Sequence, residues 1–177
     1  DEVALATDLG RFLTALRQVD ATGGPPPGSH NFFRGDPPGV YRDEAIAAMA
    51  AGAPDIDPRV ARRIWDAADG SRWDAPAVWF HGDAAPGNLL VRDGRLSAVI
   101  DFGTSGVGDP ACDLVPAWTM FDDSARRAFR DAVALDDATW ARARGWALWK
   151  ALITVRDAPD DAPARRTLVR LAADPGR

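Results

Sequence analysis

The stretch VWFHGDAAPGNLLVRDGRLSAVIDFGTSGVGDPACDL, residues 78–114, decides how this chain folds. Short apolar runs typical of strands alternate in it with loops rich in Gly, Pro and Asp. The pair Asp93-Gly94 stands between two of these runs and predicts the turn of a β-hairpin. Asn88 begins the first strand of that hairpin and Asp101 follows the second. We therefore expect both side chains to lie close together at the open end of the hairpin.

A further carboxylate precedes the hairpin. Asp83 is separated from Asn88 by AAPG, whose Pro and Gly indicate a tight loop. The carboxylates of Asp83 and Asp101 and the amide oxygen of Asn88 suit a hard cation such as Mg²⁺, whereas zinc prefers His and Cys. A carboxylate that holds no metal can accept a proton from an attacking hydroxyl group. The spacing thus favours metal-dependent chemistry on a hydroxyl group.

Helices are expected over most of the remaining chain, on the basis of apolar periodicity and of Asp or Asp-Pro at the helix starts. The residues TSGVG after Gly103 are expected to stay a glycine-rich loop, and Asp109 is expected to cap a helix that ends near Met120. The expected helices are 3–19, 41–51, 58–68, 110–120, 123–133, 138–155 and 162–173, and the expected strands are 78–80, 88–91 and 96–100.

The segment 20–39 contains GGPPPG and is expected to form a long loop rather than a regular element. Phe32 and Phe33 are expected to pin it, because two adjacent aromatic side chains are costly to leave in water. A loop of this length inside a compact domain is often functional, and a plain connector is the alternative interpretation.

Composition limits the classes of function. The chain has 177 residues with 46% hydrophobic and 27% charged content, which is typical of one globular domain. A net charge of −5 gives no support to nucleic-acid binding, and no apolar run reaches the roughly 20 residues that cross a bilayer. The single cysteine, Cys112, excludes an internal disulfide bond and favours a reducing cytoplasm. We therefore expect neither a nucleic-acid nor a membrane partner.

The order of the site residues matches the protein-kinase template, in which a catalytic Asp, an Asn five residues later and a following Asp-Phe-Gly act together. Gly82 replaces the arginine of that template and the Ala-Pro-Glu signature is missing, so a protein kinase is not expected. The motifs HGDxxxxNLLV, IDFG and GDPACDL, with NFFRG near residue 31 and WALWKAL near residue 146, instead resemble the aminoglycoside phosphotransferase and choline-kinase-like family. This resemblance covers nearly the whole chain. It implies an α+β, mostly α-helical, protein-kinase-like C-terminal lobe, in which a small antiparallel β-hairpin carries the catalytic and metal-binding loops.

The resemblance implies a role for each residue of the main motifs. Asp83 matches the family's catalytic Asp, which orients or deprotonates the acceptor hydroxyl, and Asn88 and Asp101 match its Mg²⁺ ligands. Leu90 and Ile100 match positions that form the floor of the nucleotide base, and both also fit the core of the hairpin. The implied co-substrate is ATP or GTP, and the sequence leaves that choice open.

Two further residues are expected to support the site. His81 is interpreted as a hydrogen-bonded structural residue rather than an acid or a base. Asp113 matches the last acid of the family's GDPxxD motif and would brace the catalytic loop from behind, with a solvated aspartate on a helix face as the alternative. Asp109, in the same motif, is most simply a helix cap.

Acidic pairs elsewhere allow two interpretations. The clusters at 122–123, at 136–137 and at 157 with 160–161 would form either an acidic wall for a polyamine-like substrate or the first turns of helices, where the helix dipole favours acids. We prefer the second interpretation for the first two clusters. The tryptophans are expected mostly in the core, and three of them are also candidates for lining a substrate pocket: Trp118, Trp146 and Trp149.

Two parts of a kinase are missing from the sequence. Phosphoryl transfer in kinase-like folds uses a glycine-rich loop and a strand lysine paired with a glutamate. No G-x-G-x-x-G precedes a strand here, and the only lysine, Lys150, follows the catalytic region. Residues 1–177 are therefore expected to be one domain, the C-terminal catalytic and substrate lobe, which is inactive by itself. The N-terminal nucleotide-gripping lobe is expected upstream in the same polypeptide.

The expected function is transfer of the γ-phosphate of a nucleoside triphosphate to an alcohol group of a small molecule, either an aminoglycoside-type antibiotic or a similar compound. Acceptors in the wider family include macrolides, choline, homoserine and sugar-like alcohols. The alternative is a non-catalytic kinase-like module that binds a small molecule or a protein, but the intact set of Asp83, Asn88 and Asp101 favours the enzyme. A metal-dependent phosphohydrolase is disfavoured, because it needs a second metal cluster and the chain has only two histidines.

Overall fold

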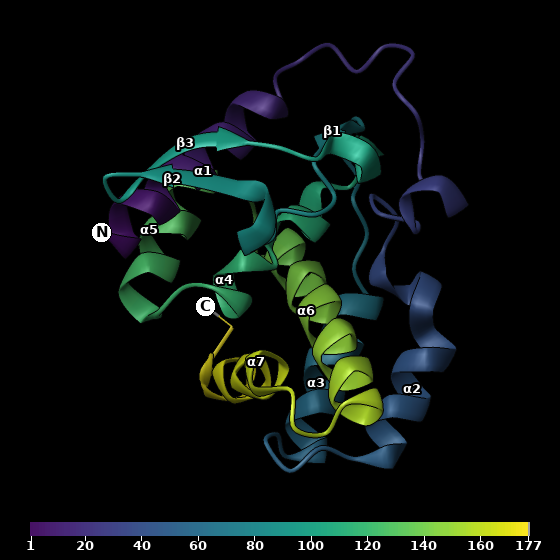
Figure 1. Ribbon diagram of the computed structural model, residues 1–177. Helices are drawn as coiled ribbons and strands as arrows, with labels where there is room; N and C mark the ends of the chain where they lie inside the picture. Colours follow the sequence, from purple (N-terminus) through teal and green to yellow (C-terminus); the bar gives the residue numbers. More distant parts are fainter. Residues whose placement is uncertain (177) are drawn as a thin grey trace.

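The structure, a computed structural model, describes residues 1–176 and confirms the predicted α+β fold, which is mostly helical. The strands form two small antiparallel sheets, which pair β1 with β4 and β2 with β3. Figure 1 shows these strands at one end of the molecule and α7 at the other. The helices are α1 (Glu2–Leu16), α2 (Arg42–Ala51), α3 (Pro58–Asp69), α4 (Pro116–Thr119), α5 (Asp123–Val133), α6 (Asp137–Asp157) and α7 (Ala162–Ala173), and the strands are β1 (Val78–Phe80), β2 (Leu89–Arg92), β3 (Arg95–Val99) and β4 (Gly106–Gly108).

Helix α6 is the central helix of the fold (Figure 1). It contacts α2, α3, α7 and the 3₁₀ turn Pro110–Leu114. Because neighbours surround α6, its buried residues lie on several sides of the helix rather than along one stripe. Helix α1 packs mainly against α5, and it also contacts β3. No helix of the described residues is long and apolar enough to cross a membrane.

Aspartate side chains begin the longer helices, as the sequence predicts. In each case a carboxylate oxygen accepts a hydrogen bond from a backbone N–H group of the first turn, which otherwise has no partner within the helix. The residues concerned include Asp57, Asp122, Asp136 and Asp161. The helix-start interpretation of the two acidic pairs at 122–123 and 136–137 is therefore confirmed.

The predicted β-hairpin is present. Strands β2 and β3 pair with Leu89 opposite Val99, and both turn residues, Asp93 and Gly94, have positive φ angles of 52° and 74°. Positive φ at both central residues is the geometry of a type I′ turn, which follows the right-handed twist of the strands. Arg95, just after the turn, donates to Asp8 of α1 at 2.6 and 2.7 Å. The hairpin is thereby attached to the first helix.

The glycine-rich segment after residue 103 is a strand and not the predicted loop. Gly106–Gly108 forms β4 and pairs antiparallel with β1. The segment 20–39 crosses beside it, since Val107 N donates to the Pro25 carbonyl and Asp109 N to the Gly35 carbonyl, both at 2.8 Å. A Cβ atom on Gly108 would lie 2.6 Å from the Gly35 carbonyl oxygen, so glycine is required for this close approach.

The prediction that Phe32 and Phe33 pin the long loop is wrong. Both residues have positive φ angles, and their side chains are 60% and 37% exposed. The loop is instead held by polar contacts. Asn31 is fully buried and accepts from Gly28 N at 3.0 Å, while Arg34 Nε donates to the Gly82 carbonyl at 3.1 Å. Backbone polar groups, rather than aromatic burial, fix this segment.

The helix predicted to run from residue 110 to about Met120 is broken into the 3₁₀ turn Pro110–Leu114 and the short helix α4. Pro116 lies at the join, and a proline lacks the N–H group that would continue the helix. Asp109 caps this turn as predicted, because its Oδ1 accepts from Ala111 N at 3.0 Å.

Asp109 has a second partner that the sequence did not indicate. Arg142 of α6 donates to its carboxylate at 2.6 and 3.3 Å, and the two side chains are only 1% and 3% exposed. The guanidinium group also donates to Ser71 Oγ, to the Arg72 carbonyl and to Thr139 Oγ1. A buried charge is tolerated only when it is paired and hydrogen-bonded, and this one is. We call Asp109 and Arg142 the core ion pair.

Candidate functional site

The loop that follows β1 is fixed by a buried aspartate. His81 N and Gly82 N donate to the two carboxylate oxygens of Asp113, each at 2.7 Å. Asp113 is buried behind the loop, on the Pro110–Leu114 turn. Burial raises the pKa of Asp113, and the two backbone N–H groups act in the opposite direction because they favour the ionised form. Asp113 thus contacts the loop from behind and is not a solvated residue on a helix face.

The ring of His81 connects this loop to the end of the hairpin. Its Nδ1 accepts from Asp83 N at 3.2 Å, and its Nε2 lies 3.0 Å from the Ile100 carbonyl. Since Nδ1 is the acceptor, the proton is on Nε2, which donates to the carbonyl. The ring also packs edge-on against Phe102, with centroids 4.6 Å apart. One buried imidazole therefore holds Asp83 and the residue before Asp101 at the same time.

Gly82 has a φ of +85°, a conformation that side chains rarely adopt. A Cβ atom at this position would also collide with the Thr104 carbonyl oxygen. The arginine of the protein-kinase template therefore does not fit here. Instead, the Gly82 carbonyl accepts from Arg34 Nε, and the Thr104 hydroxyl donates to the His81 carbonyl at 3.3 Å.

The three candidate side chains lie at the open end of the hairpin, and two of them contact each other. Asn88 Nδ2 donates to the backbone carbonyl of Asp83 at 2.9 Å and to its Oδ2 at 3.0 Å. Ile100 N donates to the Asn88 carbonyl at 2.9 Å, so Asp101 follows directly after the last bond that closes the hairpin. Asp101 has a left-handed φ of 63° and accepts from Gly103 N at 3.3 Å. The carboxylates of Asp83 and Asp101 are both exposed.

The donor set fits Mg²⁺ better than a metal held by protein alone. Within residues 1–176 there is no group of three or more His, Cys, Asp or Glu side chains that could hold a metal. The Nδ2 of Asn88 donates to Asp83, which leaves its Oδ1 to bind a cation. Asp101 adds an exposed carboxylate. Mg²⁺ is commonly bound by one or two such oxygens together with water and substrate phosphates.

Leu90 and Ile100 do not belong to the core of the hairpin, so that part of their interpretation is wrong. Their side chains are 48% and 41% exposed. Strand β3 packs on α1, but every residue of β2 after Leu89 is exposed, and so is Phe102 after β3. The result is an apolar surface next to Asn88 and Asp101.

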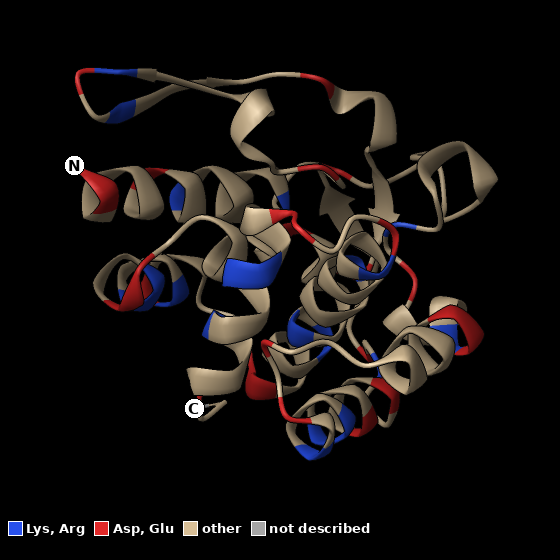
Figure 2. Cartoon of the chain, turned by 60° about the horizontal axis from the view of Figure 1, so that its bottom comes forward, with Lys and Arg blue, Asp and Glu red and all other residues tan. Residues whose placement is uncertain are grey.

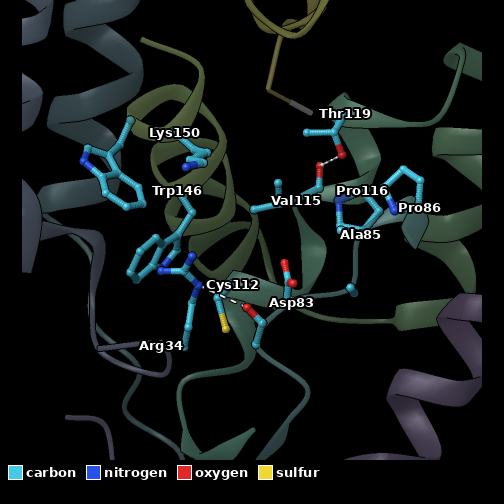
Figure 3. A pocket seen from close by; sticks show the side chains of 13 residues that line it. Arg34, Asp83, Ala85, Pro86, Cys112, Val115, Pro116, Thr119, Trp146 and Lys150 are labelled. Atoms are coloured by element: carbon cyan, nitrogen blue, oxygen red, sulfur yellow. Dashed lines mark hydrogen bonds between the residues drawn. The ribbon is translucent and has the colours of Figure 1, made fainter. Parts of the chain in front are cut away.

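An open pocket of about 240 Å³ lies beside the loop (Figure 3). Asp83 lines one side of it, while Arg34, Trp146 and Lys150 lie on the other. Trp149 also lines the pocket, so two of the three candidate tryptophans have this role. The third, Trp118, is a core residue, and its Nε1 donates to Asp174 at 2.7 Å.

Arg34 is the pocket residue that sequence reasoning missed. Its guanidinium carbon lies 5.0 Å from the ring centroid of Trp146 and 5.8 Å from that of Trp149. The motif NFFRG contains it, but no local pattern indicates that its partners are Gly82 and the tryptophans of α6. Tyr41 stacks on the far side of this group, with its ring 4.0 Å from that of Trp149.

Cys112 also lines the pocket and is buried. Burial is the main cause that raises the pKa of its thiol well above the ordinary value, which disfavours the reactive thiolate. Figure 2 shows acidic and basic positions interspersed over the helices. The acidic pairs at 122–123 and 136–137 do not line the pocket, so they form no acidic wall around it.

Comparison with known protein families matches residues 1–146 to the phosphotransferase enzyme family, APH. Solved structures with the same fold include the macrolide 2′-phosphotransferase MphH from Brachybacterium faecium, as apoenzyme, with 24% identity and a TM-score of 0.53 over 97% of this chain and 60% of that one. Aminoglycoside phosphotransferase APH(2″)-Ib, ADP-bound, matches with 18% identity and a TM-score of 0.52 over 97% and 64%. A macrolide 2′-phosphotransferase type I matches with 18% identity and a TM-score of 0.56 over 98% and 60%.

At these identities the likeness shows the fold, which corresponds to the kinase-like C-terminal lobe of such enzymes. The chain spans about 60% of the length of these structures. No curated protein sequence matches it.

Proposed function

Because the chain belongs to the phosphotransferase enzyme family, we propose that it is the lobe of a small-molecule kinase that aims an alcohol group at the terminal phosphate of a nucleoside triphosphate. The observation that carries the proposal is the position of Asp83. Its carboxylate lines the open pocket, while Asn88 and the ring of His81 hold its side chain and its backbone. A fixed carboxylate at the edge of a pocket is what a general base requires.

In the proposed reaction the acceptor hydroxyl binds in the pocket and donates a hydrogen bond to Asp83. Its oxygen forms a bond to the γ-phosphorus, while the bond from that phosphorus to the bridging oxygen of the nucleoside diphosphate breaks. The proton of the hydroxyl passes to Asp83. His81 and Asp113 touch no reacting atom in this scheme, and both are positioning residues that hold the loop from behind.

Asn88 and Asp101 are the proposed Mg²⁺ ligands. When bound, the ion would neutralise charge on the phosphates during transfer. The exposed apolar surface of Leu90 and Ile100 beside them would support the base of ATP or GTP. One solved structure with this fold is described as ADP-bound and another as a streptomycin–ATP ternary complex, which supports a nucleotide co-substrate here.

The glycine-rich loop and the phosphate-binding lysine are proposed to lie outside residues 1–177, in an N-terminal lobe of the same polypeptide. Two observations support this. The chain spans about 60% of the length of the structures it resembles, and its only lysine, Lys150, lines the pocket beside Asp83. If residues 1–177 alone transferred phosphate at the rate of the parent polypeptide, this part of the proposal would be wrong.

The test is a coupled nucleotide assay on the parent polypeptide with a panel of alcohol acceptors. Asp83→Asn should lower the transfer rate by about 10²- to 10⁴-fold, the usual contribution of a general base. The matched control is Asp93→Asn, which makes the same chemical change at the exposed turn of the hairpin and should leave the rate unchanged. Equal rates for the wild type and Asp83→Asn would remove Asp83 from the mechanism. Binding of acceptors without any transfer would instead support the non-catalytic binding module.

A further inference from the structure

The pocket beside Asp83 carries two cationic side chains against one carboxylate, Asp83 itself. We infer that it accepts an alcohol whose apolar body bears a negatively charged group, such as a carboxylate, and that it disfavours polycations. This inference rests on the proposed function, because it takes the pocket to be the acceptor site. It goes further by stating the charge of the acceptor.

The first cation, Arg34, is fixed in place and not neutralised. Its Nε donates to the Gly82 carbonyl and its Nη1 to the Phe32 carbonyl at 3.3 Å, while its guanidinium group lies over Trp146. These partners are neutral, and Arg34 makes no salt bridge within the described residues. Nη2 has no hydrogen-bond partner among the same residues. A preorganised guanidinium group with a free N–H edge is suited to a carboxylate or a phosphate.

The second cation is Lys150 on α6. It lies four residues after Trp146, which places both side chains on the same face of the helix. In Figure 3 Arg34, Trp146 and Lys150 form one side of the pocket, opposite Asp83. Lys150 is exposed and makes no salt bridge within residues 1–176, although Asp157 on the same helix is close enough to feel its charge, so its ammonium group is available to a ligand. An acceptor whose hydroxyl points at Asp83 would thus place its other end near two positive charges.

Two acidic side chains near the side of the pocket formed by Arg34, Trp146 and Lys150 already have hydrogen-bond partners outside it. Glu44 accepts from Trp149 Nε1 at 2.8 Å, and Asp157 accepts from Arg156 at 2.8 Å. Neither residue lines the pocket. Inside the pocket itself a polycation would therefore meet one carboxylate and two like charges, and like charges at close range in a partly desolvated site cost more than they do in bulk water.

The rest of the lining suits an apolar body. Trp146 and Trp149 contribute the small exposed parts of their rings, and Val115 and Pro116 close the side near Asp83. The volume of about 240 Å³ admits a body of the size of one substituted ring. Beyond Lys150 lies a second recess of about 230 Å³, which shares Lys150 with the first and gives a longer acceptor room to extend. Its lining includes Asp161, whose carboxylate accepts from Ala164 N as the cap of α7.

The first test compares an acid with its amide, which differ in charge and hardly in shape, and adds a larger polycation. Isothermal titration calorimetry on the purified protein would measure the binding of 3-phenyllactate, of its neutral amide 3-phenyllactamide and of the polycation gentamicin. We expect the acid to bind at least about tenfold more tightly than the amide, since a hydrogen bond to a charged group contributes more than one between neutral groups. Binding of the amide as tight as that of the acid, binding of neither, or tighter binding of gentamicin would overturn the inference.

The second test removes one cation. Lys150→Gln should weaken the binding of 3-phenyllactate about fivefold to tenfold and leave that of the amide unchanged. The matched control, Arg166→Gln, removes the same charge from an exposed position on α7 and should change neither affinity. Lys150 is chosen over Arg34 because Arg34 also holds the Gly82 carbonyl. Equal losses in both variants would mean that only net charge matters and would sink the assignment to this pocket.

The calorimetric readout separates this inference from the proposed function. Suppose that the acid binds preferentially but the parent polypeptide transfers phosphate to no acceptor. This result would leave the charge preference intact and refute the kinase assignment. Transfer to a polycation, with no preference for the acid, would support the kinase and refute the charge preference.

Discussion

The core ion pair and the open end of the hairpin use the same kinds of charged group in opposite ways. Asp109 and Arg142 are almost completely buried, and the guanidinium group has partners on several sides. Asp83 and Asp101 are exposed, and within the described residues each carboxylate accepts one hydrogen bond, from Asn88 Nδ2 and from Gly103 N. A charged side chain whose partners all come from the protein itself stabilises the fold. A charge that is fixed in place but left open is available to a ligand.

The largest expected effect is at the core ion pair. Arg142→Met would leave the Asp109 carboxylate buried without its partner, and we expect a loss of about 3–5 kcal/mol in the free energy of unfolding. The pKa of Asp109 is already raised, mainly by burial, so the folded variant would bind a proton more tightly than the unfolded chain does. The loss should therefore shrink as the pH falls. Urea unfolding at neutral and acidic pH would measure this.

Two further variants control this experiment. Arg59→Met makes the same change at an exposed position on α3 and should cost less than about 0.5 kcal/mol. Arg142→Met combined with Asp109→Asn removes the orphaned charge and should recover part of the stability. A double variant that is no more stable than Arg142→Met alone would show that packing, rather than charge, sets the cost.

A smaller effect is expected at Asp113. This residue is buried like the core ion pair, but it holds the loop that carries Asp83. An asparagine has one carboxamide oxygen, so in Asp113→Asn either His81 N or Gly82 N would face an NH₂ group. We expect a loss of about 1–3 kcal/mol in unfolding free energy. The transfer rate in the parent polypeptide should also fall. A variant with unchanged stability and unchanged transfer would show that Asp113 does not hold the loop.

The next effect concerns the helix cap of α6. Hydrogen bonds from the hydroxyl and backbone N–H of Thr139 lower the pKa of Asp136. A lowered carboxylate pKa gives stability that is present above the ordinary value of about 4 and is lost as the pH falls through the lowered value. Asp136→Ala should cost about 1 kcal/mol at neutral pH and less in acid. Thermal melts between pH 2 and 7 would show whether the two curves converge at low pH.

The smallest effect is expected at Asp83 itself. Asp83→Asn should change the unfolding free energy by less than about 0.5 kcal/mol, because the carboxylate is exposed and its one side-chain partner is Asn88. Paired with the expected collapse of the transfer rate, this outcome would complete the contrast with Arg142. A large loss of stability in Asp83→Asn would place Asp83 among the architectural charges instead.

Features with local causes could be predicted from the sequence. The Asp93-Gly94 turn fixes the hairpin, and aspartates before helices fix most helix starts, because the chemistry lies within a few residues. The juxtaposition of Asn88 with the end of the hairpin follows from the same local geometry.

What could not be predicted depends on contacts between distant parts of the chain. Strand β4 needs a partner from β1 and the crossing of segment 20–39, which no local pattern encodes. Arg142 looks like any arginine of an exposed helix until α6 is placed against Asp109. The exposure of Leu90 was missed for a related reason, since an apolar strand residue is expected inside unless a ligand or another part of the protein covers it.

The hydrogen bonds of His81 have a mechanical consequence. One ring touches the backbone N–H of Asp83 on one side and the carbonyl of Ile100 on the other. The loop that carries Asp83 and the strand end that carries Asp101 therefore share one buried ring, in addition to the hydrogen bonds from Asn88 to Asp83. A substitution at His81 should thus loosen both proposed halves of the site together.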